Sequence, residues 1–259
     1  MTQQKMPAVF LGHGSPMNTL QQNSFTAAWR TFGESVPKPR AVLAISAHWF
    51  VPGTHVTATP TPETIHDFGG FPQALFDFQY PAPGDPELAQ QVANLLKPLN
   101  VGLDQQWGLD HGTWSVLAHV FPKADVPVIQ LSIDRTQPGQ FHYDLGKRLA
   151  PLRDEGVLIL GSGNVVHNLG IMNWREQNVA FDWATRFNDV VKVHVANANH
   201  GPLIDFEGFG NDAALAINTK EHYLPFLYIL GALSAQERAS ILTDGIFGGS
   251  ISMLSMAIG

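Results

Sequence analysis

The sequence predicts an α/β protein with a mostly parallel or mixed central sheet flanked by helices. Short apolar runs rich in β-branched residues are bounded by glycine and proline turns, which is typical of buried strands. Longer segments with apolar residues at helical spacing lie between these runs. Strands that alternate with helices favour a sheet covered by helices, and ligands then bind beyond the carboxyl ends of the strands.

Five segments are predicted as strands, at residues 7–11, 41–46, 126–133, 157–160 and 251–258. The first four read PAVFL, AVLAIS, VPVIQLSI and VLIL, so apolar side chains fill almost every position. Such short continuous runs are consistent with strands buried inside a sheet.

Four segments are predicted as helices, at residues 87–98, 140–152, 183–196 and 221–235. The first three carry an apolar stripe, and the fourth is apolar almost throughout, which indicates a largely buried helix. The stripes consist of Leu88, Val92, Leu95 and Leu96; of Phe141, Leu145 and Leu149; and of Phe187, Val190, Val191 and His194. The content of Gly, Asn and Asp at residues 197–219 predicts a long loop.

The composition fits one domain that spans residues 1–259. A formal net charge of −7 argues against nucleic acid or an anionic membrane as a partner. The absence of cysteine excludes disulfides, thiolate metal sites and a cysteine nucleophile. The apolar stretch 223–235 is too short for a membrane span, and the apolar run near the N-terminus is too short for a signal peptide. We therefore expect a cytoplasmic protein.

Histidine is unusually frequent, with eleven residues against 15 lysines and arginines. His13, His48 and His167 each follow a predicted strand closely, in the segments GHGSP, SAHW and GSGNVVHN. One such histidine is more often an ordinary turn residue, but three at equivalent strand ends favour a common site. The GSG segment is also compatible with a phosphate-binding turn, although it lacks the lysine and the spacing of a P-loop.

Three further histidines lie in segments that could face this site. His222, in EHYLP, is predicted in the first turn of a helix capped by Thr219, and a surface position is equally compatible. His111 and His66 lie in the glycine-bearing aromatic segments LDHGTW and HDFGGFP, which are predicted as loops that wall a pocket. The other histidines are predicted to be structural or exposed: His55, His119, His142, His194 and His200.

A cluster of imidazoles can hold Zn(II), Fe(II), Cu(II) or Ni(II). Three histidine ligands leave coordination positions open, as a catalytic metal requires. A fourth, unligated histidine could act as a general acid or base. Ser15 and Ser162 lie near glycines, but the chain has no GxSxG nucleophile elbow and no HExxH motif.

Six motifs occur together, in the order GHGSP, SAHW, HDFGGFP, DHGTW, SGNVVHN and EHYLP. In this order they resemble the DOPA dioxygenase-like family, the 4,5-DOPA extradiol dioxygenases of the class III extradiol ring-cleavage superfamily. The resemblance runs from about Pro7 to the C-terminus. It implies a class III extradiol dioxygenase-like α/β fold and a single catalytic domain around one divalent metal, Fe(II) when active, with Zn(II) also able to occupy the site.

The resemblance also implies the roles of five histidines. His13 and His48 would be metal ligands, with His222 in the third position. His167 would be the acid/base residue, close enough to the metal to be a fourth ligand in a resting form. His111 would orient substrate or oxygen. Many enzymes of the wider superfamily use two histidines and a carboxylate, so Glu221 is the alternative to His222.

The activity implied is extradiol cleavage of catechols such as L-DOPA or caffeate with O₂. Trp49, Phe68, Phe71 and Trp114 are predicted as walls for the aromatic ring. A zinc-dependent hydrolase, in which the metal would lower the pKa of bound water, is the alternative enzyme, and a non-catalytic metal-binding protein is the third reading. The sequence leaves the oligomeric state open.

Overall fold

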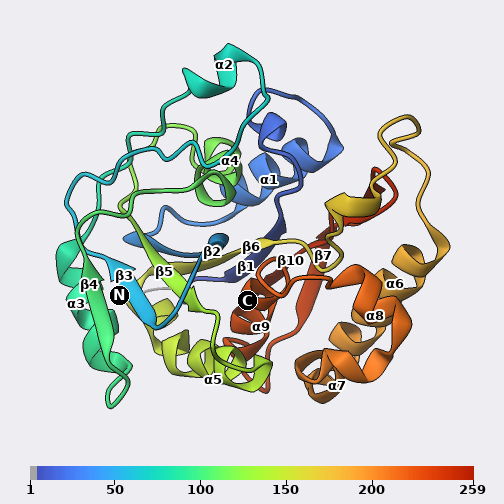
Figure 1. The fold of residues 1–259 in the computed structure, drawn as a ribbon. Helices are drawn as coiled ribbons and strands as arrows, with labels where there is room; N and C mark the ends of the chain where they lie inside the picture. Colours follow the sequence, from blue (N-terminus) through green and yellow to red (C-terminus); the bar gives the residue numbers. More distant parts are fainter. Residues whose placement is uncertain (1–4) are drawn as a thin grey trace.

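The computed structural model describes residues 5–259. Its centre is an eight-stranded sheet with the order β4-β3-β5-β2-β6-β1-β10-β7 (Figure 1). The strands of this sheet are β1 (Ala8–Gly12), β2 (Ala41–Val51), β3 (Thr54–Thr57), β4 (Val101–Asp104), β5 (Val128–Asp134), β6 (Val157–Gly163), β7 (Ala239–Thr243) and β10 (Ser255–Ile258). A small hairpin of β8 (Ile246–Phe247) and β9 (Ile251–Ser252) lies beside it.

The middle of the sheet is parallel, and its edges are mixed. β5, β2, β6 and β1 run in one direction, whereas β10 is antiparallel to β1 and β3 is antiparallel to β5. In the register, Gly12 of β1 lies opposite Gly163 of β6, and Ser46 of β2 lies opposite Ser162. The carboxyl ends of β1, β2 and β6 therefore meet at one edge of the sheet.

Helices cover both faces of the sheet (Figure 1). α1 (Ser24–Ser35) and α4 (His111–Val120) lie on one face, and α5 (Gly139–Leu149) and α9 (Leu224–Gly231) on the other. Neighbouring residues of β1 enter different cores, since Val9 packs with Trp29 of α1 and Phe10 contacts Phe226 of α9. This burial on both faces explains the continuous apolar runs of the central strands.

The predicted fold class is confirmed, as are the first four predicted strands, which correspond to β1, β2, β5 and β6. The predicted helices correspond to α3 (Pro86–Leu95), α5, α6 (Asp182–Ala196) and α9. α9 is shorter than predicted at both ends, since it begins at Leu224, with a proline in its first turn, and ends at Gly231. The late strand 251–258 is divided into β9 and β10.

The prediction of a loop at 197–219 is wrong. The segment contains α7 (His200–Ile204), the 3₁₀ turn η4 (Phe206–Phe209) and α8 (Asn211–Ala216), which are too short to produce a helical period. α1, α2 (Gln73–Phe76), β3, β4, β7 and β8 were not predicted. Within residues 5–259, no helix has both the length and the apolar character needed to cross a bilayer.

Candidate metal centre

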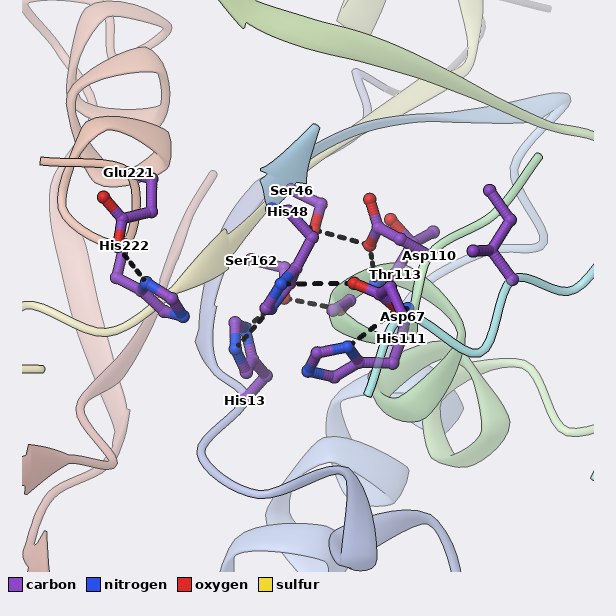
Figure 2. A network of polar contacts seen from close by, with 12 residues as sticks. His13, Ser46, His48, Asp67, Asp110, His111, Thr113, Ser162, Glu221 and His222 are labelled. Atoms are coloured by element: carbon purple, nitrogen blue, oxygen red, sulfur yellow. Dashed lines mark hydrogen bonds and ion pairs between the residues drawn. The ribbon is translucent and has the colours of Figure 1, made fainter. Parts of the chain in front are cut away.

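Three histidines converge at the carboxyl edge of the sheet (Figure 2). His13 directly follows β1, and His48 lies in β2 where the register to β5 is interrupted between Ile45 and Phe50. His222 lies in the turn just before α9. One nitrogen from each ring lies within 4.8 Å of the other two, and the Nε2 atoms of His13 and His48 are 3.3 Å apart.

Two glycines allow the backbone segments to approach so closely. A Cβ on Gly163 would collide with the carbonyl oxygen of His222, which accepts a hydrogen bond from the Asn164 amide at 2.9 Å. A Cβ on Gly112 would lie 2.8 Å from Cδ2 of His48. The glycines in the SGN and DHG motifs therefore serve close packing around the histidines.

The hydrogen bonds of Ser162 fix the tautomer of His13. The Ser162 hydroxyl donates to the Gly112 carbonyl at 2.5 Å, so its oxygen must accept from Nδ1–H of His13 at 2.9 Å. Nε2 of His13 then carries a lone pair.

Carboxylates act similarly on the other two rings. Nδ1 of His48 lies 3.3 Å from Oδ2 of Asp67, and Nδ1 of His222 lies 3.2 Å from Oε1 of Glu221. An ionised carboxylate only accepts hydrogen bonds, so these contacts favour a proton on Nδ1 and a lone pair on Nε2. The pattern matches metal-binding histidines, whose second nitrogen donates to a carboxylate or another acceptor.

The electrostatics of the cluster keep the rings neutral. Burial, together with the neighbouring imidazoles, holds the pKa of His13 and of His222 well below its ordinary value. Burial also lowers the pKa of His48, to about 3. Two lone pairs that face each other at 3.3 Å repel, and a divalent cation between them would remove that repulsion. The donor set therefore fits a metal such as zinc or iron.

His167 lies beside these three histidines, but no hydrogen bond from the described residues holds its side chain. Its ring stacks on that of His222, with centroids 3.4 Å apart and planes at 6°. Its main-chain amide donates to Ala216 at 2.8 Å, but neither ring nitrogen has a hydrogen-bond partner within the part of the chain that the structure describes. Burial lowers the pKa of His167 to about 4, so the ring is neutral at neutral pH.

His111 is the first residue of α4, so the prediction of a loop at this position is wrong. Asp110 caps the helix by accepting from the Thr113 amide at 3.1 Å. Nearly every residue of α4 is buried, which removes the polar and apolar alternation that would have revealed a helix. Thr219 does not cap α9 as predicted, and its hydroxyl donates instead to Glu221 at 2.7 Å.

Asp67 is a site residue that was not singled out from the sequence. Oδ1 accepts from both the main-chain amide and Nδ1 of His111, at 3.0 and 2.8 Å, while Oδ2 faces His48 (Figure 2). Burial would raise the pKa of Asp67, but the hydrogen bonds from His111 and the electrostatic influence of the adjacent His111 and His48 imidazoles outweigh it and bring the pKa to about 2. The available signal was a lone carboxylate inside the aromatic HDFGGFP motif.

Comparison with known proteins agrees with this geometry. A family model described as the catalytic LigB subunit of aromatic ring-opening dioxygenase matches residues 7–253. The chain belongs to this family.

Individual relatives of this LigB-family protein cover nearly its whole length. A protein of Escherichia coli (strain K12) named 4,5-DOPA dioxygenase extradiol is 50% identical, over 100% of this chain and 97% of the relative. A Beta vulgaris protein of the same name is 37% identical, over 94% and 92%. The crystal structure of an uncharacterized Escherichia coli K12 protein superposes with a TM-score of 0.87 at 45% identity, over 98% of this chain and 100% of that one. The predicted family and the class of enzyme, an extradiol ring-opening dioxygenase, are thereby confirmed.

The histidines of this dioxygenase line a cavity of about 670 Å³. His13, His48, His111, His167 and His222 all contribute to its wall. A cavity of this volume can hold a small organic molecule that is larger than a single aromatic ring.

Two of the four predicted ring walls line this cavity, namely Phe68 and Phe71. The predictions for Trp49 and Trp114 are wrong. Trp49 stacks on Trp107 with centroids 5.3 Å apart, and Trp114 is fully buried and donates Nε1–H to the Ile65 carbonyl at 2.8 Å. Both rings are used for packing and leave no face toward the cavity.

The remaining histidines lie outside the cavity wall. His66, predicted as a pocket residue, instead contacts the Phe78 carbonyl through Nε2 at 3.0 Å. His119 contacts the Asn18 carbonyl at 2.8 Å, and His142 and His200 contact tyrosine hydroxyls at 3.0 and 2.9 Å.

Proposed function

We propose that this LigB-family dioxygenase opens catechols such as L-DOPA or caffeate with O₂ at one divalent metal, Fe(II) in the active enzyme or Zn(II) when exchanged. The ligands would be His13, His48 and His222. The observation that carries this proposal is the convergence of one ring nitrogen from each histidine, while each Nδ1 has an acceptor beside it. The Escherichia coli and Beta vulgaris relatives, named 4,5-DOPA dioxygenase extradiol, support the choice of catechol.

His222 is favoured over Glu221 as the third ligand. Glu221 Oε1 already accepts from Thr219 and contacts Nδ1 of His222, so Glu221 would orient the imidazole. When bound, the metal would supply Lewis-acid stabilisation of the catecholate and a path for electrons from the ring to O₂. Three neutral ligands would leave its full positive charge for this purpose.

His167 would accept a proton from a catechol hydroxyl. Its neutral ring lines the cavity, and within residues 5–259 no protein group occupies its nitrogens. Stacking on His222 would hold the ring next to the metal site, close enough for His167 to become a fourth ligand when no substrate is present. The proposed base, His167, would thus differ from the three ligands in that no hydrogen bond from a described residue holds its imidazole.

His111 would orient the substrate or oxygen. Its Nδ1–H donates to Asp67, so that its Nε2 is free to contact a molecule in the cavity.

Both atoms of O₂ would enter the product. The ring bond beside the two hydroxyls would break, and two new carbon–oxygen bonds would form.

The test is anaerobic reconstitution of metal-free protein with Fe(II), followed by L-DOPA or caffeate and then oxygen. We expect stoichiometric oxygen uptake and the yellow absorbance of a ring-opened semialdehyde. The His167→Ala variant should retain iron and lose turnover. Absence of uptake across a panel of catechols, with iron demonstrably bound, would reject the proposed reaction, and an empty site in His167→Ala would reject the division of roles.

A further inference from the structure

The cavity opens to solvent through a mouth formed by Gln21, Leu169, Trp174 and Gln177, the lining residues whose side chains are largely exposed. Three of these residues belong to one segment, 169–177. Hydrogen bonds fix this segment to the turn between β8 and β9, because the Asn173 amide donates to Gly248 at 2.8 Å and the Gly248 amide donates to Gln177 at 2.7 Å. The mouth is therefore held in place before substrate arrives.

The wall of this cavity contains no cationic side chain among the described residues. Its one ionised lining residue of fixed charge is Asp67, and a second carboxylate, Glu221, contacts the lining residue His222. Arg175 follows Trp174 directly but does not line the cavity, and Lys220 is paired with Glu207 at 2.8 Å. A carboxylate on a bound molecule would thus lose water at this mouth without gaining a cationic partner.

The polar and aromatic groups of the mouth are suited to substrate side chains that are neutral or carry an ammonium group. Within residues 5–259 the side-chain amides of Gln21 and Gln177 have no hydrogen-bond partner, so both can donate and accept, whereas their main chains are hydrogen-bonded. The Trp174 ring is 66% exposed and can stack on an apolar tail or interact with an ammonium group.

From these observations we infer that the cavity selects catechols whose side chain carries no net negative charge. The inference rests on the proposed function and narrows its substrate class. Neutral alkyl or amide tails, amines and zwitterionic amino acids would be accepted, and tails that carry only a carboxylate would be disfavoured. L-DOPA would accordingly be a better substrate than caffeate.

The test compares two catechols of equal length, 3-(3,4-dihydroxyphenyl)propanoate and its primary amide, with the Fe(II)-loaded enzyme at neutral pH. We expect kcat/KM from oxygen uptake to be about tenfold higher for the amide, mainly through KM, which corresponds to about 1.4 kcal/mol. An equal or higher kcat/KM for the acid would overturn the inference.

Binding of the same pair separates this inference from the reaction. Calorimetry with Zn(II)-loaded protein gives a Kd ratio that does not depend on turnover. Failure to oxidise either catechol would reject the proposed function, while the Kd ratio would still decide the selection. Equal Kd values would overturn the inference even if both catechols were oxidised.

A charge placed in the mouth sharpens the test. Gln177→Arg should raise kcat/KM for the acid and bring the ratio of amide to acid close to one. The matched control is Gln90→Arg, an exposed position on α3 that adds the same charge away from the cavity wall. The control should keep the original ratio, and an equal change in both variants would overturn a role for the mouth.

Discussion

Two buried polar clusters lie at opposite ends of β1, and they differ in how completely the protein satisfies them. Before the strand, the fully buried Arg153 uses every N–H it has. It donates to the carbonyls of Met6, Ala232 and Ile258 and to both carboxylate oxygens of Glu237, at 2.6 to 3.3 Å. This cluster is complete within the chain.

After the strand, the histidine cluster is incomplete. The Nδ1 atoms of His13, His48 and His222 have acceptors, whereas the two Nε2 lone pairs of His13 and His48 face each other at 3.3 Å. Both clusters are desolvated, so burial alone does not distinguish a structural network from a functional one. The distinction lies in whether the protein itself supplies the missing partner.

The largest effect should come from removing one of the histidines that face each other. His13→Ala should bind no metal after dialysis and lose at least ~10³-fold in turnover, because the proposed metal would supply the electrophilic chemistry. Its metal-free form should unfold with nearly the same free energy as the wild type. The measurements are metal content by emission spectrometry, oxygen uptake and urea unfolding.

A matched control is His142→Gln, which removes another fully buried histidine, on α5 and outside the cluster. This variant should keep its metal. Full metal content in His13→Ala would contradict the proposed ligand set.

The complete cluster should show the opposite behaviour. Arg153→Met removes the donor of three carbonyls and leaves Glu237 with Lys5 and the Ser234 amide, and it should lower the free energy of unfolding by about 3–5 kcal/mol. Lys5 contacts the same Glu237 at 3.2 Å but is partly exposed, so Lys5→Met should cost less than about 1 kcal/mol. Metal content of the folded protein should not change in either variant. Equal losses in the two variants would show that burial does not set the contribution of this ion pair.

The same contrast explains what the sequence could predict. The apolar strands and the motifs at their ends placed His13, His48 and His167 at one edge, because parallel strands bring equivalent ends together. The partners at Nδ1 could not be predicted. Asp67 and Glu221 lie in irregular segments whose course depends on tertiary packing, and Ser162 of β6 is brought to His13 only by the pairing of β6 with β1.

The predicted aromatic wall residues show where prediction from the sequence fails. Trp114 and Phe68 both occur in glycine-bearing aromatic motifs, yet Trp114 is packed inside α4 and only Phe68 lines the cavity. The position of Trp114 in α4 decides this difference. Because nearly every residue of α4 is buried, its sequence shows no alternation of polar and apolar residues from which that position could be predicted. α1 was also missed, although Asn23 and Thr26 form a capping box that a search for helix starts would detect.

A smaller effect should follow from changing a partner of the histidines. Asp67→Asn leaves one oxygen to serve two Nδ1–H groups, so His48 or His111 loses its acceptor. We expect metal affinity to fall by about 10- to 100-fold, with a further decrease in kcat from misorientation of His111. Competition with a chelator measures the affinity.

The control for this change is Asp77→Asn, which removes the charge of an exposed carboxylate that accepts a hydrogen bond from Gln73 at 2.8 Å. This variant should behave as the wild type does. Unchanged metal affinity in Asp67→Asn would show that Asp67 does not support the ligands.

The last prediction concerns pH, and the two clusters should lose stability in different pH ranges. The pKa values of His48 and His167 are lowered by burial to about 3 and about 4, whereas the unfolded histidines titrate near 6.5. As pH falls below 6.5, the unfolded chain binds protons that the fold excludes, so the metal-free fold loses stability. The loss is about 1.4 kcal/mol per pH unit for each such histidine.

The Arg153 cluster should add its own loss only at lower pH. Burial raises the pKa of Glu237, but Arg153 outweighs it and brings the pKa to about 2, below the ordinary 4.5. Its stabilisation is therefore complete above pH 4.5 and declines as the pH falls toward 2. Urea unfolding with chelator should show a decline between pH 6.5 and 4.5 that becomes shallower in His167→Ala and is unchanged in Arg153→Met. A decline that begins only below 4.5 would show that the histidines do not stay neutral in the fold, and the contrast between the two clusters would then fail.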